Sequence, residues 1–492
     1  MHEPNVNTPS IDYEAMETER KLPRALVGGT KAMRAGKAEW TPKLKDETDD
    51  ELTARLSHYY LVDFYDSAVS ELVDRMFSRG LVFEGVPAPV EALWENLDGS
   101  GRSGDKFFYD VTLDAARYGY SAVQCDHTEQ PLDEAGNPRA LTTAETEEYG
   151  ARPFVVHRKA SAVIAVDQAP DTGLPTIQRV RLRETKVEPD PEKEFSQITR
   201  ELVRMIERGA PEMPSSWRVY EQDDNKEWQV VESGVHAPPL GAPPDVARKF
   251  REVFLTPFYM SFERFHFARP SFGRGADLCL QHWQKKGDVD FIEHLANTPS
   301  LVLKADTDLE IKSLGSRKVV RIPVDGELEW LVIDPKGVGA TKESIAHLEE
   351  HIREVFNQPR KLKGAAGREL VGVRLMDETE SMTRAQMWAV GIAQSITQCL
   401  DHLAWWLGLP SGGVVTFPED ALEKLSDPQG FDDVIAMGKS RLLSKAAVQR
   451  EAVRYGKLDE DHDIEVDLEA LAAEAPALPD FGGADDEGGD ES

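Results

Sequence analysis

The stretch from Phe272 to Gly408 contains three helical patterns, and these decide the predicted architecture. They are Gly273–Asn297 (GRGADLCLQHWQKKGDVDFIEHLAN), Thr341–Phe356 (TKESIAHLEEHIREVF) and Thr379–Gly408 (TESMTRAQMWAVGIAQSITQCLDHLAWWLG). In each, apolar residues recur at the three- and four-residue spacing of an amphipathic helix. Gly408 followed by Pro410 predicts where the third helix ends. At 1.5 Å per residue this helix would be roughly 45 Å long, enough to cross a whole domain.

The segment between the first two helices changes to a strand pattern. Residues Thr298–Pro335 alternate apolar and polar side chains in four short runs separated by Asp and Gly turns. The runs are Leu301/Leu303, Leu309/Ile311, Val320/Ile322/Val324 and Leu328/Trp330/Val332. This pattern predicts a small β-sheet inserted between two helices.

A basic loop separates the second and third helices. Between Asn357 and Asp377, Arg360, Lys361, Lys363, Arg368 and Arg374 face only Glu369 and Asp377, which gives a local charge of +3. The chain as a whole has a formal net charge of −31, and its last part, Asp459–Ser492, has fourteen acidic residues and no Lys or Arg. A basic loop with three glycines therefore stands out from an acidic chain. Its Val371–Leu375 part also fits a short strand.

The first 265 residues are predicted to form an α+β domain. Residues 1–48 are polar and aperiodic, which indicates an arm or an irregular lead-in. Two helices are expected at Glu51–Arg79 and Lys106–Tyr118, the second ending at Gly119. A further helix is predicted at Ser196–Arg208. Strands are expected at Ser121–Cys125, Phe154–His157, Ala162–Val166, Gln178–Arg183, Trp217–Tyr220, Trp228–Val231 and Phe254–Met260.

The chain beyond Gly408 is predicted to contain short helices and an acidic end. The helices are expected at Pro428–Ser440, Lys445–Tyr455 and Val466–Ala475. The Gly-, Asp- and Glu-rich tail cannot bury a core, so we expect it to be disordered and solvated.

Composition excludes several classes of protein. No run of about 18 apolar residues occurs, so no transmembrane helix is expected, and Met1–Glu14 lacks the regions of a signal peptide. Cys125, Cys279 and Cys399 are far apart and are expected to be buried thiols in a reduced protein. The net charge argues against wrapping DNA over a general basic surface.

Motifs that could carry chemistry have simpler explanations. Gly99–Gly104 matches GxGxxG but follows a helix-like segment rather than a strand, so we interpret it as a connection between helices. His347, Glu350 and His351 match a zinc pattern, yet they lie on the polar side of their helix and no third ligand follows. A Walker A loop and a GxSxG motif are absent from the sequence. We therefore predict a protein that is not an enzyme, with no catalytic residue, metal or cofactor.

The order of these segments and stretches of their amino-acid sequence resemble the portal proteins of tailed bacteriophages, over about residues 45 to 470. The stretches that carry the resemblance are Tyr59–Val73 (YYLVDFYDSAVSELV), Ala116–Val123 (ARYGYSAV), Phe262–Leu303 with its GRGADL entry, Asp377–Ala385 (DETESMTRA) and Ser444–Leu458. Portal proteins form rings, usually of twelve subunits, at one capsid vertex, and the genome enters and leaves through the ring. The resemblance implies a virion protein made in the host cytoplasm.

The resemblance also implies an α+β portal-type fold with these parts. They are an N-terminal arm (1–48), a wing (49–265), a first stem helix (266–297), a clip (298–340), a second stem helix (341–356), a tunnel loop (357–378), the long helix with a second part of the wing (379–430), a helical crown (431–475) and the acidic tail (476–492). It implies as partners other copies of this chain, double-stranded DNA in the channel, the terminase large subunit, a head–tail adaptor and the major capsid protein, with no membrane.

In this interpretation the basic loop faces DNA. We expect Arg360, Lys361, Lys363 and Arg368 to touch the phosphate backbone weakly, because each firm phosphate contact would add salt-dependent affinity and hinder sliding. The alternative role for these cations is pairing with acids of a neighbouring subunit. Two other functions remain open: a different structural head protein, such as a minor capsid or scaffolding component, and an enzyme with an unrecognised site.

Overall fold

A computed structural model describes residues 5–128, 145, 150–169, 175–190, 193, 195–223, 225–239, 241–297, 300–304, 327–331, 338–356, 371–418 and 444–454. The chain divides into two compact units, Met1–Leu422 and Glu423–Ser492. The part of the second unit that the structure describes is one helix, which Ser444 caps through its hydroxyl and the backbone N–H of Ala447 (3.2 Å). All other elements below belong to the first unit.

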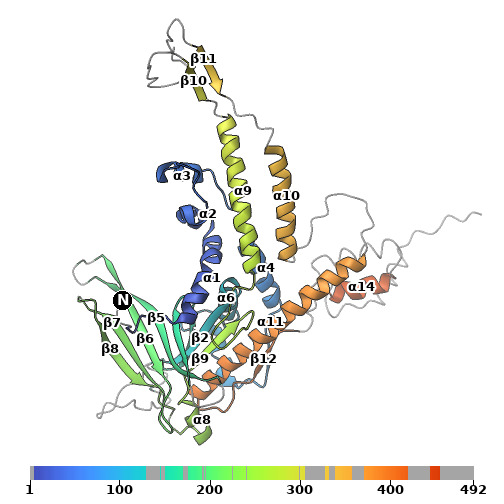
Figure 1. The fold of residues 1–492 in the computed structure, drawn as a ribbon. Coiled ribbons are helices and arrows are strands. Elements are labelled where there is room, and N and C mark those ends of the chain that lie inside the picture. The colour runs from blue at the N-terminus through green and yellow to red at the C-terminus, as the bar shows by residue number, and fades with distance from the viewer. Residues whose placement is uncertain are drawn as a thin grey trace, which may run out of the picture. The chain divides into compact units, whose positions relative to one another are not determined.

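The fold is mixed helix and sheet, as predicted (Figure 1). The α-helices are α1 (Ile11–Val27), α2 (Gly29–Ala35), α3 (Asp49–Leu56), α4 (Tyr65–Phe77), α5 (Ala88–Glu91), α6 (Gly104–Tyr118), α8 (Pro244–Lys249), α9 (Gly273–Asn297), α10 (Val338–Val355), α11 (Val371–Trp406) and α14 (Lys445–Arg454), with 3-10 turns η1 (Lys37–Glu39) and η2 (Trp94–Asn96). The strands are β1 (Val82–Glu84), β2 (Tyr120–His127), β3 (Pro153–Arg158), β4 (Val163–Gln168), β5 (Ile177–Pro189), β6 (Gln197–Glu207), β7 (Ser216–Gln222), β8 (Trp228–Val235), β9 (Leu255–Tyr259), β10 (Ser300–Lys304), β11 (Glu327–Leu331) and β12 (Val414–Thr416).

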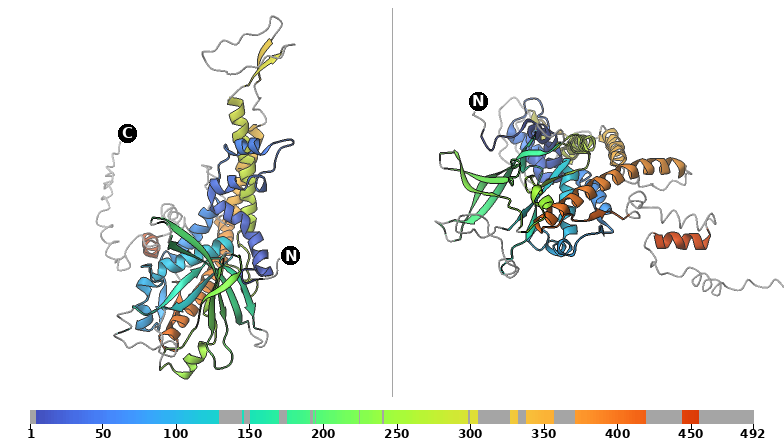
Figure 2. Two further views of the ribbon diagram at one scale, coloured as in Figure 1. Left: turned by 90° about the vertical axis from the view of Figure 1, so that its left-hand side faces the viewer. Right: turned by 90° about the horizontal axis from the view of Figure 1, so that it is seen from below.

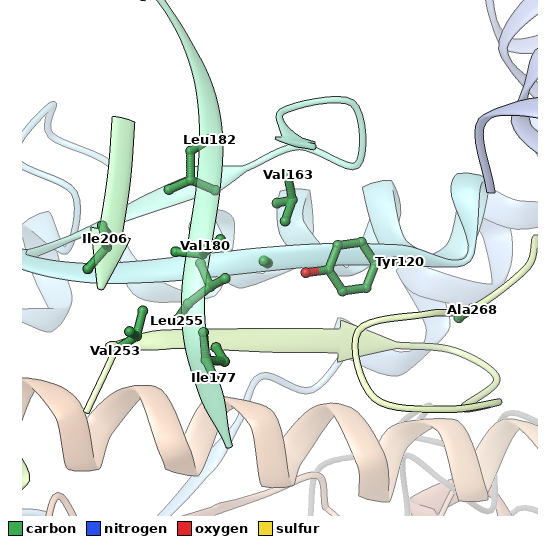
Figure 3. Close-up of a cluster of buried hydrophobic side chains, with 10 residues drawn as sticks. Tyr120, Val163, Ile177, Val180, Leu182, Ile206, Val253, Leu255 and Ala268 are labelled. Carbon is green, nitrogen blue, oxygen red and sulfur yellow. The ribbon is translucent and has the colours of Figure 1, made fainter. Parts of the chain in front are cut away.

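Two antiparallel sheets enclose the main apolar core. One sheet has the order β4-β5-β6-β7-β8 and the other the order β3-β2-β9. Side chains from both sheets, including Tyr120, Val180, Leu182 and Leu255, meet in a single buried cluster (Figure 3). On β5, Ile177, Val180 and Leu182 are buried in this core. Strand β2 is buried at every residue from Tyr120 to Cys125, because helices α6 and α11 also contact it.

Helices α6 and α11 contact the three-stranded sheet. Phe108 of α6 stacks on Phe258 of β9 at 5.9 Å between ring centroids. On α11, Ile392, Ile396 and Cys399 are buried, and the Ser395 hydroxyl donates to the Pro257 carbonyl (2.9 Å). The second half of α11 is therefore a core helix of the first unit.

Several predicted elements are confirmed. Helix α6 ends at Gly119, whose φ of 82° and close contact with the Arg269 backbone leave no room for a side chain. Helix α9 has the predicted bounds, α10 and α14 nearly so, and Gly408 follows α11 with a φ of 74°. The strands expected before residue 265 are all present. The buried positions of Cys125, Cys279 and Cys399 are also confirmed.

The prediction that residues 1–48 are irregular is wrong, because α1 and α2 lie there. The buried face of α1 includes Tyr13, Met16, Arg20 and Leu26 at helical spacing. Arg20 is fully buried, and its guanidinium donates to the Tyr118 and Ala160 carbonyls (3.0 and 3.2 Å). The helical pattern of α1 was missed in the sequence because Arg20, a charged residue, occupies one of its buried positions.

The single helix predicted at Glu51–Arg79 is also wrong. Helix α3 ends before Ser57 and α4 begins after Phe64. The Asp63 carboxylate accepts the backbone N–H of Asp66 (3.1 Å) and so caps the second helix. Tyr59 lies in the break between the two helices, and its side chain is fully buried.

The helix predicted at Ser196–Arg208 is in fact strand β6. Its apolar residues fit both a helical and a strand period, so the pattern alone did not decide. Eleven residue pairs join β6 to β5, from Arg179↔Glu207 to Pro189↔Gln197, and this pairing fixes the extended form. Tertiary contact here overrides the local pattern.

The long helix begins earlier than predicted. Helix α11 starts at Val371, so the last part of the expected 357–378 loop is helical and the suggested strand at Val371–Leu375 is wrong. In the expected small sheet, β10 pairs with β11 antiparallel from Ser300↔Leu331 to Lys304↔Glu327. The predicted runs at 309–311 and 320–324, the helices at 428–440 and 466–475 and the acidic tail lie outside the described residues.

Candidate nucleic-acid interface and its supporting helices

The four predicted DNA-contacting residues, Arg360, Lys361, Lys363 and Arg368, lie in residues 357–370, outside the part of the chain that the structure describes. Both flanks of this segment are described. It follows Phe356, the residue after α10, and precedes Val371, the first residue of α11. What the structure brings together is the set of helices from which the basic segment extends.

An aromatic cluster holds the start of the basic segment. The Phe356 ring lies 5.5 Å from Phe272 and 6.0 Å from Tyr65, and Phe272 meets Trp388 of α11 at 5.6 Å. A Cβ on Gly275 would overlap the Phe356 ring, so this glycine is what lets the ring rest on α9. Burial raises the pKa of Tyr65, whose hydroxyl donates to the Arg117 carbonyl (2.7 Å). The segment therefore leaves from a fixed point.

Helices α9 and α10 lie side by side and antiparallel (Figures 1 and 2). Paired contacts run from Gly275–Phe356 through Lys285–Ser344 (3.0 Å) to Glu293–Lys342, rising in α9 as they fall in α10. Val289 and Ile345 form a small buried cluster between them. The pairing brings the end of α9, which precedes the β10–β11 insert, close to the start of α10, which follows it.

A buried histidine links the same two helices. His282 of α9 is 1% exposed at its side chain, and its Nε2 lies 3.1 Å from Glu349 Oε1 of α10. Burial lowers the pKa of His282, although Glu349 opposes this shift. The imidazole is therefore neutral near pH 7 and acts as a hydrogen-bonding link rather than as a charge.

Residues 40–59 brace the opposite side of α9. The fully buried Trp283 donates its indole N–H to the Thr41 hydroxyl (3.0 Å), and Gln284 donates to the Trp40 carbonyl (2.8 Å). The Tyr59 ring packs on Gly287, where a Cβ would overlap it, and the Tyr59 hydroxyl donates to Asp288. We call Trp40, Thr41, Tyr59, Trp283 and Gly287 the α9 brace.

An ion pair fixes Tyr59 within the brace. Arg55 bonds Glu47 through two parallel contacts of 2.8 and 2.9 Å, and it donates to the Tyr59 hydroxyl (2.7 Å). The side chains of Arg55 and Glu47 are 4% and 7% exposed. The hydrogen bonds from Arg55 lower the pKa of Glu47, as a bidentate charged pair should. Sequence analysis missed this brace because its partners are more than two hundred residues apart.

The motifs considered for enzyme chemistry are located as follows. Gly99 and Gly101 have positive φ values in the connection between η2 and α6, so the GxGxxG match does not follow a strand. His347 and Glu350 are 83% and 68% exposed at their side chains and 3.8 Å apart. In the described residues, no three His, Cys, Asp or Glu side chains gather as a metal site would require.

Two Ser–His–Asp arrangements emerge only from the structure. Ser121 Oγ and Asp114 Oδ2 both approach the same atom, His157 Nε2, at 2.9 and 3.5 Å. A catalytic triad needs the serine and the carboxylate on opposite ring nitrogens. The arrangement is therefore suited to tying α6 to β2 and β3.

The second arrangement has its serine and carboxylate on opposite ring nitrogens, but exchanged relative to a catalytic triad, and it is enclosed. Ser215 Oγ lies 2.8 Å from His236 Nδ1, and Asp126 Oδ1 lies 3.9 Å from Nε2. Ser215 is fully buried and His236 is 3% exposed, so a substrate could not reach the hydroxyl. Burial lowers the pKa of His236, as it does for His266 and His402, which both fall to about 3.

Comparison with known proteins gives one family match. A family profile described as "Domain of unknown function (DUF4055)" matches residues 276–407, which include α9, α10 and α11. A search of curated proteins finds no match. In the described part of the chain, the helices are too short or too polar to cross a membrane.

Solved structures of gene transfer agent particles contain chains similar to this one. A chain in the neck of a native particle, computed with twelve-fold symmetry, is 12% identical, with 77% of this chain and 86% of that chain covered and a TM-score of 0.35. A chain in the virion of the native particle gives 12% identity, 86% and 98% coverage and a TM-score of 0.35. A chain in the neck of an empty particle, computed with six-fold symmetry, gives 11% identity, 79% and 89% coverage and a TM-score of 0.36.

Proposed function

We propose that this chain is a structural subunit of a phage-type particle, specifically a portal protein that forms a ring through which double-stranded DNA passes. One observation carries the proposal: α9 and α10 form a braced antiparallel pair with a β-hairpin insert at one end and a basic segment leading into a 36-residue helix at the other. This order of parts is the one that the sequence resemblance to portal proteins implies.

The physical requirements of a DNA channel fit the distribution of charge. A wall that lets a duplex slide must not bind phosphates firmly, because each fixed contact adds affinity. A net charge of −31 supplies repulsion, and Arg360, Lys361, Lys363 and Arg368 supply a few contacts that break and reform. In this function α9 and α10 are the stem, the β10–β11 insert is the clip that meets the terminase large subunit and then the head–tail adaptor, and the segment after Phe356 is the tunnel loop.

The remaining parts of the chain follow from the same proposal. The two-sheet body is the wing, residues 431–475 form the crown, and the wing meets the major capsid protein. Such a subunit has no catalytic residue, metal or cofactor of its own and acts in the virion at one vertex of the capsid.

The first test is electron microscopy of the purified full chain. Rings of about twelve subunits with a central hole are expected, since a head-to-tail interface that closes generates a ring. Stable monomers or small closed dimers at high protein concentration would contradict the proposal and direct attention to an enzymatic function.

The second test addresses the basic segment. In a packaging assay, the double variant Lys361→Ala/Lys363→Ala should form normal rings and package less DNA. The matched control is Lys31→Ala/Lys45→Ala, which removes two exposed lysines far from the segment in the sequence. Unchanged packaging by the first variant would show that these lysines do not contact DNA.

A further inference from the structure

The long helix contains a run without any charged side chain. From Ala385 to Leu400, sixteen residues in succession lack Asp, Glu, Lys and Arg, although such residues make up 29% of the chain. Arg384 and Asp401 bound the run. A helix that faced the core on one side and water on the other would normally carry charges on its outer face. The run therefore marks a helix whose outer face has another role.

One face of this run is buried within the first unit. Four residues of this face are fully buried where α11 contacts the three-stranded sheet: Ala389, Ile392, Ile396 and Cys399. The hydroxyl of Thr397 accepts the backbone N–H of Val415 in β12 (3.0 Å). These contacts fix the rotation of α11 about its axis and so determine which residues remain outside.

The opposite face is exposed and uncharged. Met387, Val390, Gln394 and Gln398 follow one another at three- and four-residue spacing, and all four are exposed. Met387 and Val390 are 63% and 52% exposed. A Cβ added at the neighbouring Gly391 would meet no atom within 4 Å, so the backbone there is open to close approach. We call these four residues and Gly391 the uncharged ridge.

The chemistry of the ridge restricts what can cover it. Nucleic acid fits the ridge poorly, because affinity for phosphates comes mainly from Lys and Arg, and the ridge has neither. Two apolar side chains are too few for a membrane surface. Depletion of charge with exposed Met and Val side chains is typical of the centre of a protein–protein interface.

Charge also points to which protein covers it. Two copies of a chain with a net charge of −31 repel each other over most of their surfaces. They approach each other most readily where that charge is absent, and the uncharged ridge is such a place on the described surface. A ring of identical subunits needs one surface of each copy to meet a different surface of the next.

We propose that the uncharged ridge of α11 is a subunit interface, covered by a second copy of this chain in the assembled ring. This inference rests on the proposed function, since it names the partner surface of the same assembly. The long helix would then have two packed faces, one inside its own subunit and one against the neighbour.

The first experiment compares Val390→Glu with Val187→Glu in the full chain. Val187, on β5, is 57% exposed, close to the value for Val390, but it lies outside the ridge. Val390→Glu should reduce the fraction of rings at least about tenfold, because a buried unpaired carboxylate weakens association. The fraction is read by mass photometry and by electron microscopy. Rings that form equally well with both variants would overturn the inference.

A folding readout separates loss of assembly from loss of the subunit. The monomeric Val390→Glu protein should keep the thermal midpoint of monomeric wild type at low concentration, because position 390 is solvent-exposed within one chain. If the midpoint falls, the nearly isosteric Gln394→Glu repeats the test at a second exposed ridge position. Normal assembly of that variant would show that the inference is wrong. If the wild-type protein forms no rings, the proposed function is wrong. That result differs from one in which wild type forms rings and the ridge variants do so equally well, which would contradict only the inference about the ridge.

The second experiment identifies the occupant of the ridge. A photoreactive amino acid at Gln394 is activated in purified wild-type assemblies, and the products are separated by mass. A cross-link between two copies, at twice the 54.9 kDa of one chain, is expected. Cross-links that form only within one chain, or only to a different protein in assembled particles, would contradict the inference.

Discussion

The α9 brace and the outer end of the β5–β6 hairpin are held by opposite means. In the brace, Trp283 and Tyr59 are fully buried, and Gly287 lets a ring lie directly on the helix. At the outer end of the hairpin, Arg200 pairs with Glu188 and Glu221 on the surface, and Val187 is 57% exposed. Desolvated packing fixes position strongly, whereas solvated ion pairs fix it weakly. The difference indicates that α9 is held in place more firmly than the outer end of the hairpin.

The largest expected effect is on the brace. Trp283→Ala removes a buried indole and leaves the Thr41 hydroxyl without its partner, which should cost about 3–5 kcal/mol in the free energy of opening of α9. Hydrogen exchange of the α9 amides measures this quantity. The control is Trp217→Ala in β7, where the half-buried ring should cost clearly less. Equal losses in the two variants would contradict the expectation that a fully buried indole stabilises its surroundings more than a half-buried one.

A smaller effect is expected from a single methyl group. Gly287→Ala should destabilise α9 by about 1–3 kcal/mol, because the new Cβ overlaps the Tyr59 ring and the contact must shift. In α10, Gly339→Ala meets no atom within 4 Å and should be neutral or slightly stabilising, since alanine favours helix. The thermal midpoints of the two variants give the comparison. A stabilising Gly287→Ala would show that Tyr59 does not rest on α9.

Acid should affect the two regions in different pH ranges. Burial lowers the pKa of His282 from its ordinary 6.5, so the unfolded state binds more protons, and stability around α9 is full above pH 6.5 and declines as pH falls. The decline is at most about 1.4 kcal/mol per pH unit. In the sheet, Arg158 and Arg204 lower the pKa of Glu184 from 4.5, although burial opposes them, so its contribution is lost only below pH 4.5.

Hydrogen exchange at pH 7.0 and 5.5, corrected for intrinsic rates, tests this difference. Amides of α9 should lose protection between these values, while those of β5 and β6 around Glu184 should keep theirs. His282→Gln should flatten the response of α9. A response of α9 that survives this substitution would assign the pH dependence to other groups.

The smallest effect is expected at the outer end of the hairpin. Arg200→Ala removes solvated ion pairs with Glu188 and Glu221 and should lower the urea midpoint only slightly. The loss should disappear at about 1 M salt, where the screening length is near 3 Å. Urea midpoints at low and high salt provide the measurement. A large loss that does not depend on salt would mean that these pairs are more buried than the comparison assumes.

The sequence predicted the elements whose patterns are local. The apolar spacing of α9 and α10, and the glycines at 119 and 408, depend on neighbours along the chain, and these predictions are confirmed. The prediction failed at α1, where the buried Arg20 occupies a core position, and at β6, where pairing with β5 overrides an ambiguous pattern. Distant partners decided both outcomes.

In the candidate site too, the local elements could be predicted and the distant contacts could not. The helices that support the basic segment could be predicted, but the brace could not, because the hydrogen bond between Trp283 and Thr41 joins residues 242 positions apart. The contacts of Arg360, Lys361, Lys363 and Arg368 remain predictions, since residues 357–370 lie outside the described part.

The antiparallel contacts between α9 and α10 have a consequence for natural variation. Gly275 meets Phe356 at one end and Glu293 meets Lys342 at the other, so the two helices share one register. An insertion in one helix alone would displace every later contact. Lineages that lengthen or shorten this pair should therefore change both helices together, in steps of about seven residues or two turns. The contacts that set this register all lie in the two helices, so a change of length between Lys304 and Glu327 would not shift it.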